Sequence, residues 1–273
     1  MLKILMLMAI KNIFRLVKVW LRISFLAAES QLLTNFSGVL FLVGKFVKFS
    51  FFFLFFFNVL SEAGNLGIYS REQVILFFLV FNLVDIVTQF LFRGVYLFRF
   101  SVVNGAYDFD LLKPLPSYFR PVFGWTDTLD FITLIPLVTY LFYFVSSRGI
   151  SSSPISWLLF LVLILNSLWI AFAFHLLICS VCILTLAIDH LVWIYRDLLG
   201  MARFPTDVYP RMVQSFLTFT IPVVVLITVP AKALMGILSW RWILLSLGVG
   251  VFSLWISFKF WHSALSRYSS ASS

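Results

Sequence analysis

Long apolar runs follow one another along the chain, and each is bounded by polar or charged residues. A helix of about 20 residues crosses the hydrocarbon core of a bilayer, where every backbone group must be hydrogen-bonded internally. Runs of this length predict membrane spans at about 42–61, 73–92, 128–147 and 242–261. The pattern therefore predicts an all-α, polytopic integral membrane protein.

The stretch from Gly149 to Ile188 holds 40 residues without a Lys, Arg, Asp or Glu. A helix of that length would measure about 60 Å, twice the thickness of the bilayer core. Two packed spans at about 155–178 and 183–203 account for this stretch, and so does one over-long span that ends near Asp189. With two spans here, the chain has about six crossings.

Prolines interrupt the next region, about 205–235, and oppose one straight helix there. They are typical of a broken, re-entrant helical hairpin before the last span, shielded by other helices. The stretch from Met212 to Ala231 is also 20 uncharged residues, which is long enough to cross. The positive-inside rule favours that crossing, because it would place three neighbouring arginines inside. The prolines are Pro205, Pro210, Pro222 and Pro230, and the arginines are Arg196, Arg203 and Arg211.

The first 30 residues interleave basic and bulky apolar side chains. Basic residues spaced by four, three and four positions share one face of a helix, and apolar residues fall on the other flank. These interfacial anchors are Lys11, Arg15, Lys18 and Arg22. The pattern predicts an amphipathic helix over 3–30 that lies in the headgroup plane at the cytoplasmic surface. It is not the pattern of a cleavable signal peptide, in which an uncharged apolar stretch follows one charged head.

Composition narrows the class of protein further. The 273 residues are 62% hydrophobic and only 11% charged, and their mean hydropathy is +1.05. So few charges exclude a soluble enzyme, a disordered chain and a secreted disulfide scaffold. The net charge of +9 would suggest nucleic acid in a soluble protein. Here the basic residues flank apolar runs, so the partner they indicate is the lipid bilayer, with both termini in the cytoplasm.

No motif predicts catalysis. The histidines are scattered over different segments, and the pair Cys179 and Cys182 lies in an apolar stretch without further ligands. The run from Gly38 to Phe46 has the wrong spacing for a phosphate loop, and no hydroxyl follows its lysine. The sequence thus predicts neither an enzyme nor a metal or cofactor site. Energy for transport must come from another subunit or from an ion gradient.

The segment between the second and third spans carries the most information. An Asn-Gly turn opens it, two acids and a lysine flank a pair of leucines, and prolines end any long helix. We predict a short amphipathic helical element over about 105–118 at the cytoplasmic face. From the residues alone it is either an ordinary interfacial connector or a peg that docks into a groove on a cytoplasmic partner.

Three passages, in matching order and spacing, resemble the ABC-2 type permeases, specifically the six-span bacterial group called ABC-2 family transporter proteins. GAYDFDLLKPLP, from Gly105 to Pro116, is similar to the group's G-x-x-D-x-x-L-L-(K/R)-P-L signature. The proline-punctuated stretch from Arg203 to Pro230 resembles the one before the group's last span. The end, FWHSALSRYSSASS, is similar to W-x-x-(A/G)-L-x-x-Y-x-S-A.

The resemblance implies a permease that pairs with a second permease subunit, identical or paralogous, and with cytoplasmic ABC ATPase subunits. ATP and Mg²⁺ would bind to the ATPase and not to this chain. The element at 105–118 would be the coupling helix, seated in a cleft of the ATPase, and 205–235 would be re-entrant on the outer side. The coupling residues implied are Gly105, Asp108, Asp110, Leu111, Leu112, Lys113, Pro114 and Pro116.

The expected function is ATP-driven export of a hydrophobic or amphiphilic compound across the bacterial inner membrane. The alternatives are an ion-coupled secondary transporter and a membrane-embedded transferase, the latter around Asp189 and His190. Asp85 lies inside the second predicted span, where acids are costly and often functional. It is a candidate for the transport path, or it forms a structural pair with one of three basic residues, namely Lys45, Lys48 or Arg93.

Overall fold

The computed structural model describes residues 2–32, 38–40, 42–47, 50–51, 54–55, 58, 66–150, 153–186 and 189–270. Over these residues the regular elements are helices, and the β-type pairing they contain is one isolated bridge between Leu66 and Tyr69. The predicted all-α class is confirmed. Nine of the 20 residues of the span expected at 42–61 lie outside the described residues.

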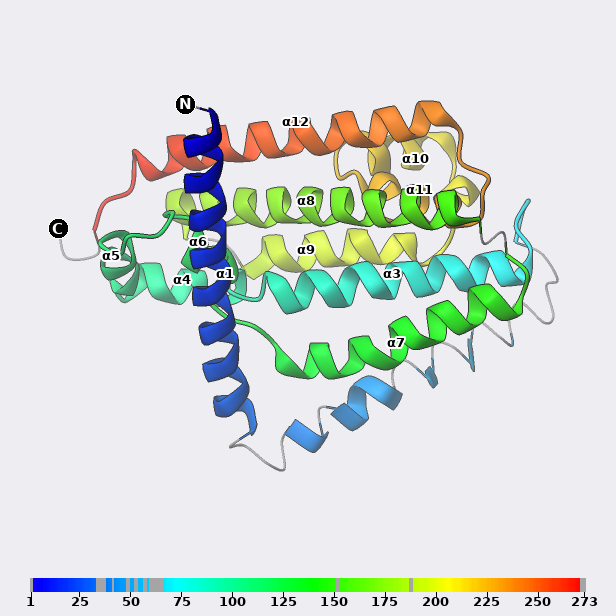
Figure 1. The fold of residues 1–273 in the computed structure, drawn as a ribbon, viewed down its shortest axis with the longest axis horizontal. Helices are drawn as coiled ribbons and strands as arrows, with labels where there is room; N and C mark the ends of the chain where they lie inside the picture. Colours follow the sequence, from blue (N-terminus) through cyan, green and yellow to red (C-terminus); the bar gives the residue numbers. More distant parts are fainter. Residues whose placement is uncertain are drawn as a thin grey trace.

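The longer helices lie side by side as a bundle (Figure 1). They are α3 (Arg71–Leu91), α7 (Thr128–Ser147), α8 (Pro154–Thr185), α9 (Asp189–Gly200) and α12 (Trp240–Leu265). α8 packs against α12, and α3 packs against α7. α1 (Leu2–Leu32) runs across the direction of the bundle. It covers the residues of the helix expected at 3–30, whose place at the membrane surface stays a prediction.

Four helical stretches in the described part of the chain are long and apolar enough to cross a membrane. They are α3 with the following α4 (Val95–Val103), then α7, α8 and α12. α7 has the bounds expected for the third span, while α3 and α12 contain the spans expected at 73–92 and 242–261 to within a residue. A bent helix pair near residue 220 would raise the number to five.

The region between 154 and 203 differs from the two spans expected there. α8 continues for 32 residues through the expected break at 178–183, because no Gly or Pro interrupts its sequence. It ends at Leu186, whose φ of 58° is left-handed. α9 follows with 12 residues, or about 18 Å. It is shorter than the bilayer core, yet it leads back along the bundle from the end of α8 towards α10 (Figure 1). One over-long span and a short amphipathic helix therefore replace the predicted spans 155–178 and 183–203.

The contact between α8 and α12 buries small and polar side chains. Asn166 Nδ2 donates to the carbonyl oxygen and to Oγ of Ser246, both at 2.9 Å, and both residues are buried. Large apolar residues of the same helices, such as Leu158 and Trp255, are more than half exposed. Polar groups inside and apolar groups outside are typical of helices that pack within lipid.

The proline-rich region forms a broken helix pair at one end of the bundle (Figure 1). α10 (Arg211–Phe219) is bent by 82° from the helical stretch Val224–Leu234, which comprises the π-helix η3 (Val224–Thr228) and α11 (Val229–Leu234). The four predicted prolines stand at or next to helix ends, where a missing N–H costs little. This bend is the geometry of either a broken span or a re-entrant loop.

Hydrogen bonds and an ion pair hold this broken pair in place. Asp207 lies in η2 (Thr206–Val208). Its carboxylate accepts from the hydroxyl of Tyr69 and lies 2.7 Å from Lys232 Nζ. The hydroxyl of Ser167 on α8 lies 2.8 Å from the carbonyl oxygen of Leu226. One backbone carbonyl of the broken pair is therefore satisfied by α8, in keeping with what irregular backbone buried among helices requires.

Candidate functional site

A cavity of about 840 Å³ lies between α3, α7 and α9. Its walls are mainly aliphatic and aromatic, and they include Phe78, Phe81, Leu137, Tyr140 and Trp193. Charged side chains from all three helices and from neighbouring segments also reach it. They are Lys45, Asp85, Arg93, Asp127, Asp130, Arg196 and Arg203. A large apolar pocket with a few polar groups is the usual form of a ligand site.

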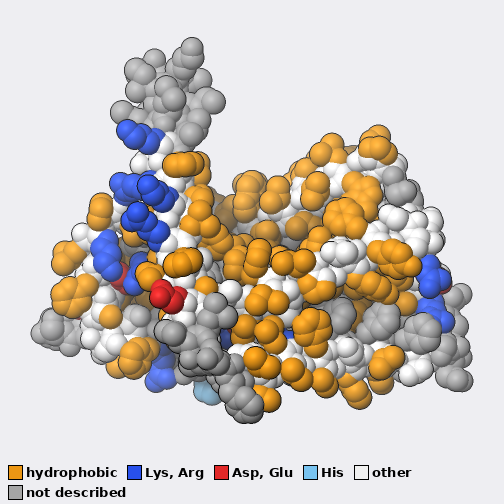
Figure 2. Space-filling view, turned by 60° about the horizontal axis from the view of Figure 1, so that its bottom comes forward, with side chains coloured by type: hydrophobic (Ala, Val, Ile, Leu, Met, Phe, Trp, Pro, Cys, Tyr) orange, Lys and Arg blue, Asp and Glu red, His pale blue; other side chains and the backbone are white. Residues whose placement is uncertain are grey.

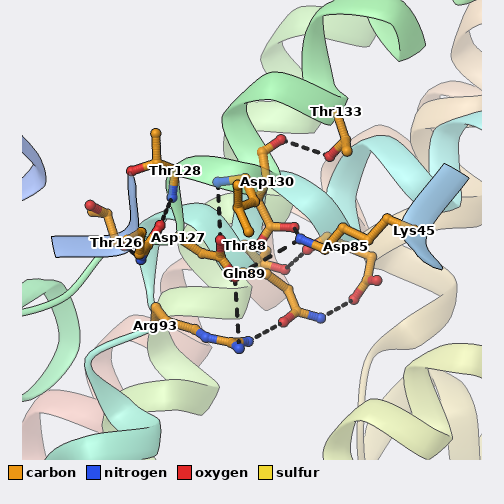
Figure 3. Close-up of polar contacts among 12 residues, drawn as sticks. Lys45, Asp85, Thr88, Gln89, Arg93, Thr126, Asp127, Thr128, Asp130 and Thr133 are labelled. Carbon is orange, nitrogen blue, oxygen red and sulfur yellow. Dashed lines mark hydrogen bonds and ion pairs between the residues drawn. The ribbon is translucent and has the colours of Figure 1, made fainter. Parts of the chain in front are cut away.

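A ladder of hydrogen bonds runs along one face of α3 and just beyond its end (Figure 3). Gln89 Nε2 donates to Asp85 Oδ1 at 3.2 Å, and Arg93 Nη1 donates to Gln89 Oε1 at 3.0 Å. The three side chains meet because positions four apart share a helix face. Gln89 therefore connects the carboxylate of Asp85 to the guanidinium of Arg93.

The start of α7 supplies two buried acids to the same cavity. Asp127 is the N-cap, and its Oδ1 accepts from the N–H of Leu129 at 3.1 Å. Its Oδ2 lies 3.8 Å from Arg93 Nη2 and 3.9 Å from Lys45 Nζ. Asp130 pairs with Lys45 (Figure 3). Two acids and two bases thus form one network.

Asp85 lies outside this network of ion pairs. Neither Lys45 nor Arg93 pairs with its carboxylate, and the connection to Arg93 passes through Gln89. Lys48, the third partner considered from the sequence, lies outside the described residues. Of the two interpretations of Asp85, the arrangement favours a group that faces the cavity.

The predicted coupling segment lies at the end of the bundle away from α10 and α11 (Figure 1). Gly105, with φ 75°, opens α5 (Ala106–Leu111), since a left-handed residue there favours glycine. Tyr107 is fully buried, and its hydroxyl donates to the carbonyl oxygen of Ser117 at 3.2 Å. Trp261 of α12 donates to the hydroxyl of Ser117 at 3.0 Å. The segment is thereby fastened to the last long helix.

The C-terminal tail also holds this segment. Asp108 accepts hydrogen bonds from the hydroxyls of Tyr268 at 2.9 Å and Ser270 at 2.7 Å. Burial, then the hydrogen bond to Asp108 and its negative charge, raise the pKa of Tyr268 to about 12. On another side, Arg15 of α1 donates to the carbonyl oxygen of Pro114.

Most of the charged residues expected to contact a partner instead form hydrogen bonds or ion pairs within the chain. Asp108 holds the tail, and Asp110 pairs with Lys113 at 2.7 Å and with Arg120 at 3.3 Å. The outward face is apolar instead. Leu112 is 82% exposed and Phe109 is 70% exposed, whereas Leu111 is 36% exposed.

The four predicted basic anchors of α1 are exposed. Figure 2 shows basic side chains gathered along α1, while the nearby flank of the bundle is covered largely by apolar side chains. Large apolar residues of α1, such as Phe14 and Phe25, are also more than 70% exposed. A helix with both faces uncovered has the pattern of an interfacial helix.

Several site residues were not predicted from the sequence. Phe109 shares a helix face with Leu112, three positions on, which is the signal that could have found it. Asp127 has the position of a helix N-cap, but its ionic partners come from distant segments. Tyr268 and Ser270 are the Tyr and the Ser of the C-terminal passage that resembles the family, but nothing in that passage relates them to Asp108. In the part of the chain that the structure describes, no three His, Cys, Asp or Glu side chains gather as metal ligands.

A comparison with protein families identifies a related family. The family described as ABC-2 family transporter protein matches residues 46–272, which contain the coupling segment and most of the residues that line the cavity. No curated protein and no solved structure matches the chain.

Proposed function

The chain belongs to the family of ABC-2 transporter proteins, and from this membership we propose that it is the permease subunit of an ATP-driven exporter. A separate cytoplasmic ATPase binds ATP and Mg²⁺, and a second permease subunit completes the transport path. The observation that supports this proposal most directly is the exposure of two apolar side chains, Phe109 and Leu112. They lie on a segment that hydrogen bonds hold to neighbouring parts of the chain.

The coupling segment has the properties of a rigid lever. Its exposed apolar side chains suit a cleft on the ATPase, where their burial would stabilise the complex. Tyr107 packs edge-to-face on Phe98 of α4 and on Tyr268 of the tail, with ring centroids 5.0 and 5.3 Å apart. A push on α5 is thereby passed to α4 and α12, and the permease halves rock without any catalytic side chain.

The cavity supplies the path for the cargo. Its apolar walls suit a hydrophobic or amphiphilic compound, and Asp85 provides a polar group at membrane depth. Rocking of α3 and α7 against α9 would change the shape of this cavity. The network of Lys45, Asp127 and Asp130 keeps the start of α7 attached during that movement.

The two ends of the bundle correspond to the two sides of the bacterial inner membrane. α5, α1 and the C-terminal tail lie towards one end, which we assign to the cytoplasm together with both termini. α10 and α11 lie at the other end, so 205–235 is assigned as re-entrant from the outer side.

Capture of the full-length chain from its native membrane tests the proposal. We expect an ABC ATPase to co-purify and its ATP hydrolysis to depend on the coupling segment. The double variant F109D/L112D should lose ATPase capture at least tenfold, because two charges would enter an apolar cleft. The control M212D/F219D changes residues that are 87% and 74% exposed at the opposite end and should retain capture. Equal capture by both double variants would contradict the docking role.

A further inference from the structure

Six of the seven charged residues that line the cavity fall into two groups, and the seventh, Arg203, lies 5.2 Å from the centroid of the Phe81 ring. Lys45, Arg93, Asp127 and Asp130 neutralise one another in the network at the start of α7. Asp85 on α3 and Arg196 on α9 line the same cavity outside that network. Neither has an oppositely charged partner within 4 Å in the described part of the chain.

Each of these two charges is positioned by a neutral group. Asp85 accepts a hydrogen bond from the amide of Gln89. The guanidinium of Arg196 lies 5.4 Å from the centroid of the Trp193 ring, an attractive cation–π geometry, and beside the neutral hydroxyl of Tyr96. The carboxylate of Asp85 and the guanidinium of Arg196 are thus positioned in the cavity by neutral groups, and no ion pair neutralises either of them.

Leaving ions unpaired at membrane depth is costly. A ligand with a single charge would pair with one of them and leave the other unpaired. A ligand that carries both charges would satisfy both. The apolar walls, with Phe81, Ile86 and Leu137 among them, would receive an attached hydrocarbon chain.

We propose that the cavity binds a zwitterionic phospholipid, with its ammonium group on Asp85, its phosphate on Arg196 and its acyl chain along the apolar wall. The volume of about 840 Å³ suits a head group with part of a chain, and it lies within the range of small-molecule sites. That this lipid is cargo rests on the proposed transport function, whereas the binding itself needs no ATPase.

Binding is measured on the full chain in maltoside micelles with tail-labelled lysophosphatidylethanolamine. Unlabelled competitors of equal chain length vary only the head group: lysophosphatidylethanolamine is zwitterionic, lysophosphatidylglycerol is anionic and an alkyltrimethylammonium is cationic. We expect the zwitterion to compete at least tenfold better than either singly charged compound, in keeping with two charged contacts instead of one. A sulfobetaine of that length has both charges and no phosphate. If the sulfobetaine competes as well as lysophosphatidylethanolamine, the cavity recognises the two charges whatever chemical groups carry them. If the sulfobetaine competes less well, the cavity recognises the phosphate, which supports a phospholipid.

Two substitutions test the assignment of each charge. Asp85→Asn should weaken zwitterion binding about tenfold and shift the preference towards the anionic competitor, since Arg196 remains. Arg196→Gln should weaken it as much and shift the preference towards the cationic one. A misfolded variant would lose all three competitors together, so the direction of the shift separates recognition from unfolding.

Matched controls use the same chemical changes away from the cavity. Asp197→Asn and Arg211→Gln replace exposed residues that do not line it, and both should retain the original preference. Equal affinity for all head groups, or an unchanged preference in Asp85→Asn and Arg196→Gln, would overturn the proposal. Either result would leave the capture of an ATPase unaffected, so the two proposals fail separately.

Discussion

Gly250 on α12 has no room for a side chain beside α8. A Cβ placed there would lie 2.0 Å from Asn166 Oδ1, whereas nothing lies within 4 Å of one at Gly248. Asn166 cannot move aside freely, because its amide is bonded to Ser246. The close approach of the two helices therefore depends on a single missing methyl group.

Gly250→Ala should lower the free energy of unfolding by about 1–3 kcal/mol, the usual cost of overpacking a well-filled interface. Gly248→Ala is the matched control and should be neutral or slightly stabilising, because alanine favours a helix over glycine. Thermal unfolding of both variants in the same detergent is the measurement. Equal melting temperatures for the two would show that α12 can shift to make room.

The site residues could be predicted from the sequence only where a residue is unusual in its own segment. Asp85 was recognised because it is an acid inside an apolar run. Arg196 was treated as a marker of membrane orientation, since nothing near it in sequence relates it to α3. Its place at the cavity follows from the packing of α9, which an apolar pattern does not encode.

At the scale of elements, α7 was predicted with its observed bounds because a capping acid precedes it and Arg148 follows it. Of the two divisions expected for the next stretch, the two packed spans were wrong and the one over-long helix is observed, because the expected break has no glycine or proline. Leu186 adopts the left-handed conformation itself, and the sequence gives no signal for a non-glycine residue in that region. α9 was then too short and too polar to be the span that composition suggested.

The contact between the tail and α5 should be visible in a pH titration. The pKa of Tyr268 is raised to about 12 from 10.0, so its neutral form stabilises the folded state. That stabilisation is complete below pH 10 and is lost as the pH rises towards about 12. Asp108→Asn should lower this pKa, because it removes a negative charge. The tyrosinate absorbance of each protein, minus that of its Tyr268→Phe counterpart, gives the value, and an unchanged pKa would contradict the contact.

At the scale of the whole molecule, Leu112 and Met212 mark opposite ends of the bundle, and both are more than 80% exposed. The assigned orientation predicts that a cysteine at 212 reacts with an impermeant maleimide in intact cells. A cysteine at 112 should react only after the membrane is permeabilised. Cys179 and Cys182 are buried and should give little background. Labelling of both positions from one side would favour a crossing between 212 and 231 over a re-entrant hairpin.

The unequal lengths of α7 and α8 make bilayer thickness a variable for this protein. The 32 residues of α8 measure about 48 Å and the 20 residues of α7 about 30 Å. In a thicker bilayer α8 can adapt by reducing its tilt from the membrane normal. α7 has no extra length, so the bilayer around it must become thinner. Acyl-chain length would thus change the tilt of α8 relative to α7, which lines the cavity, before any ligand or nucleotide arrives.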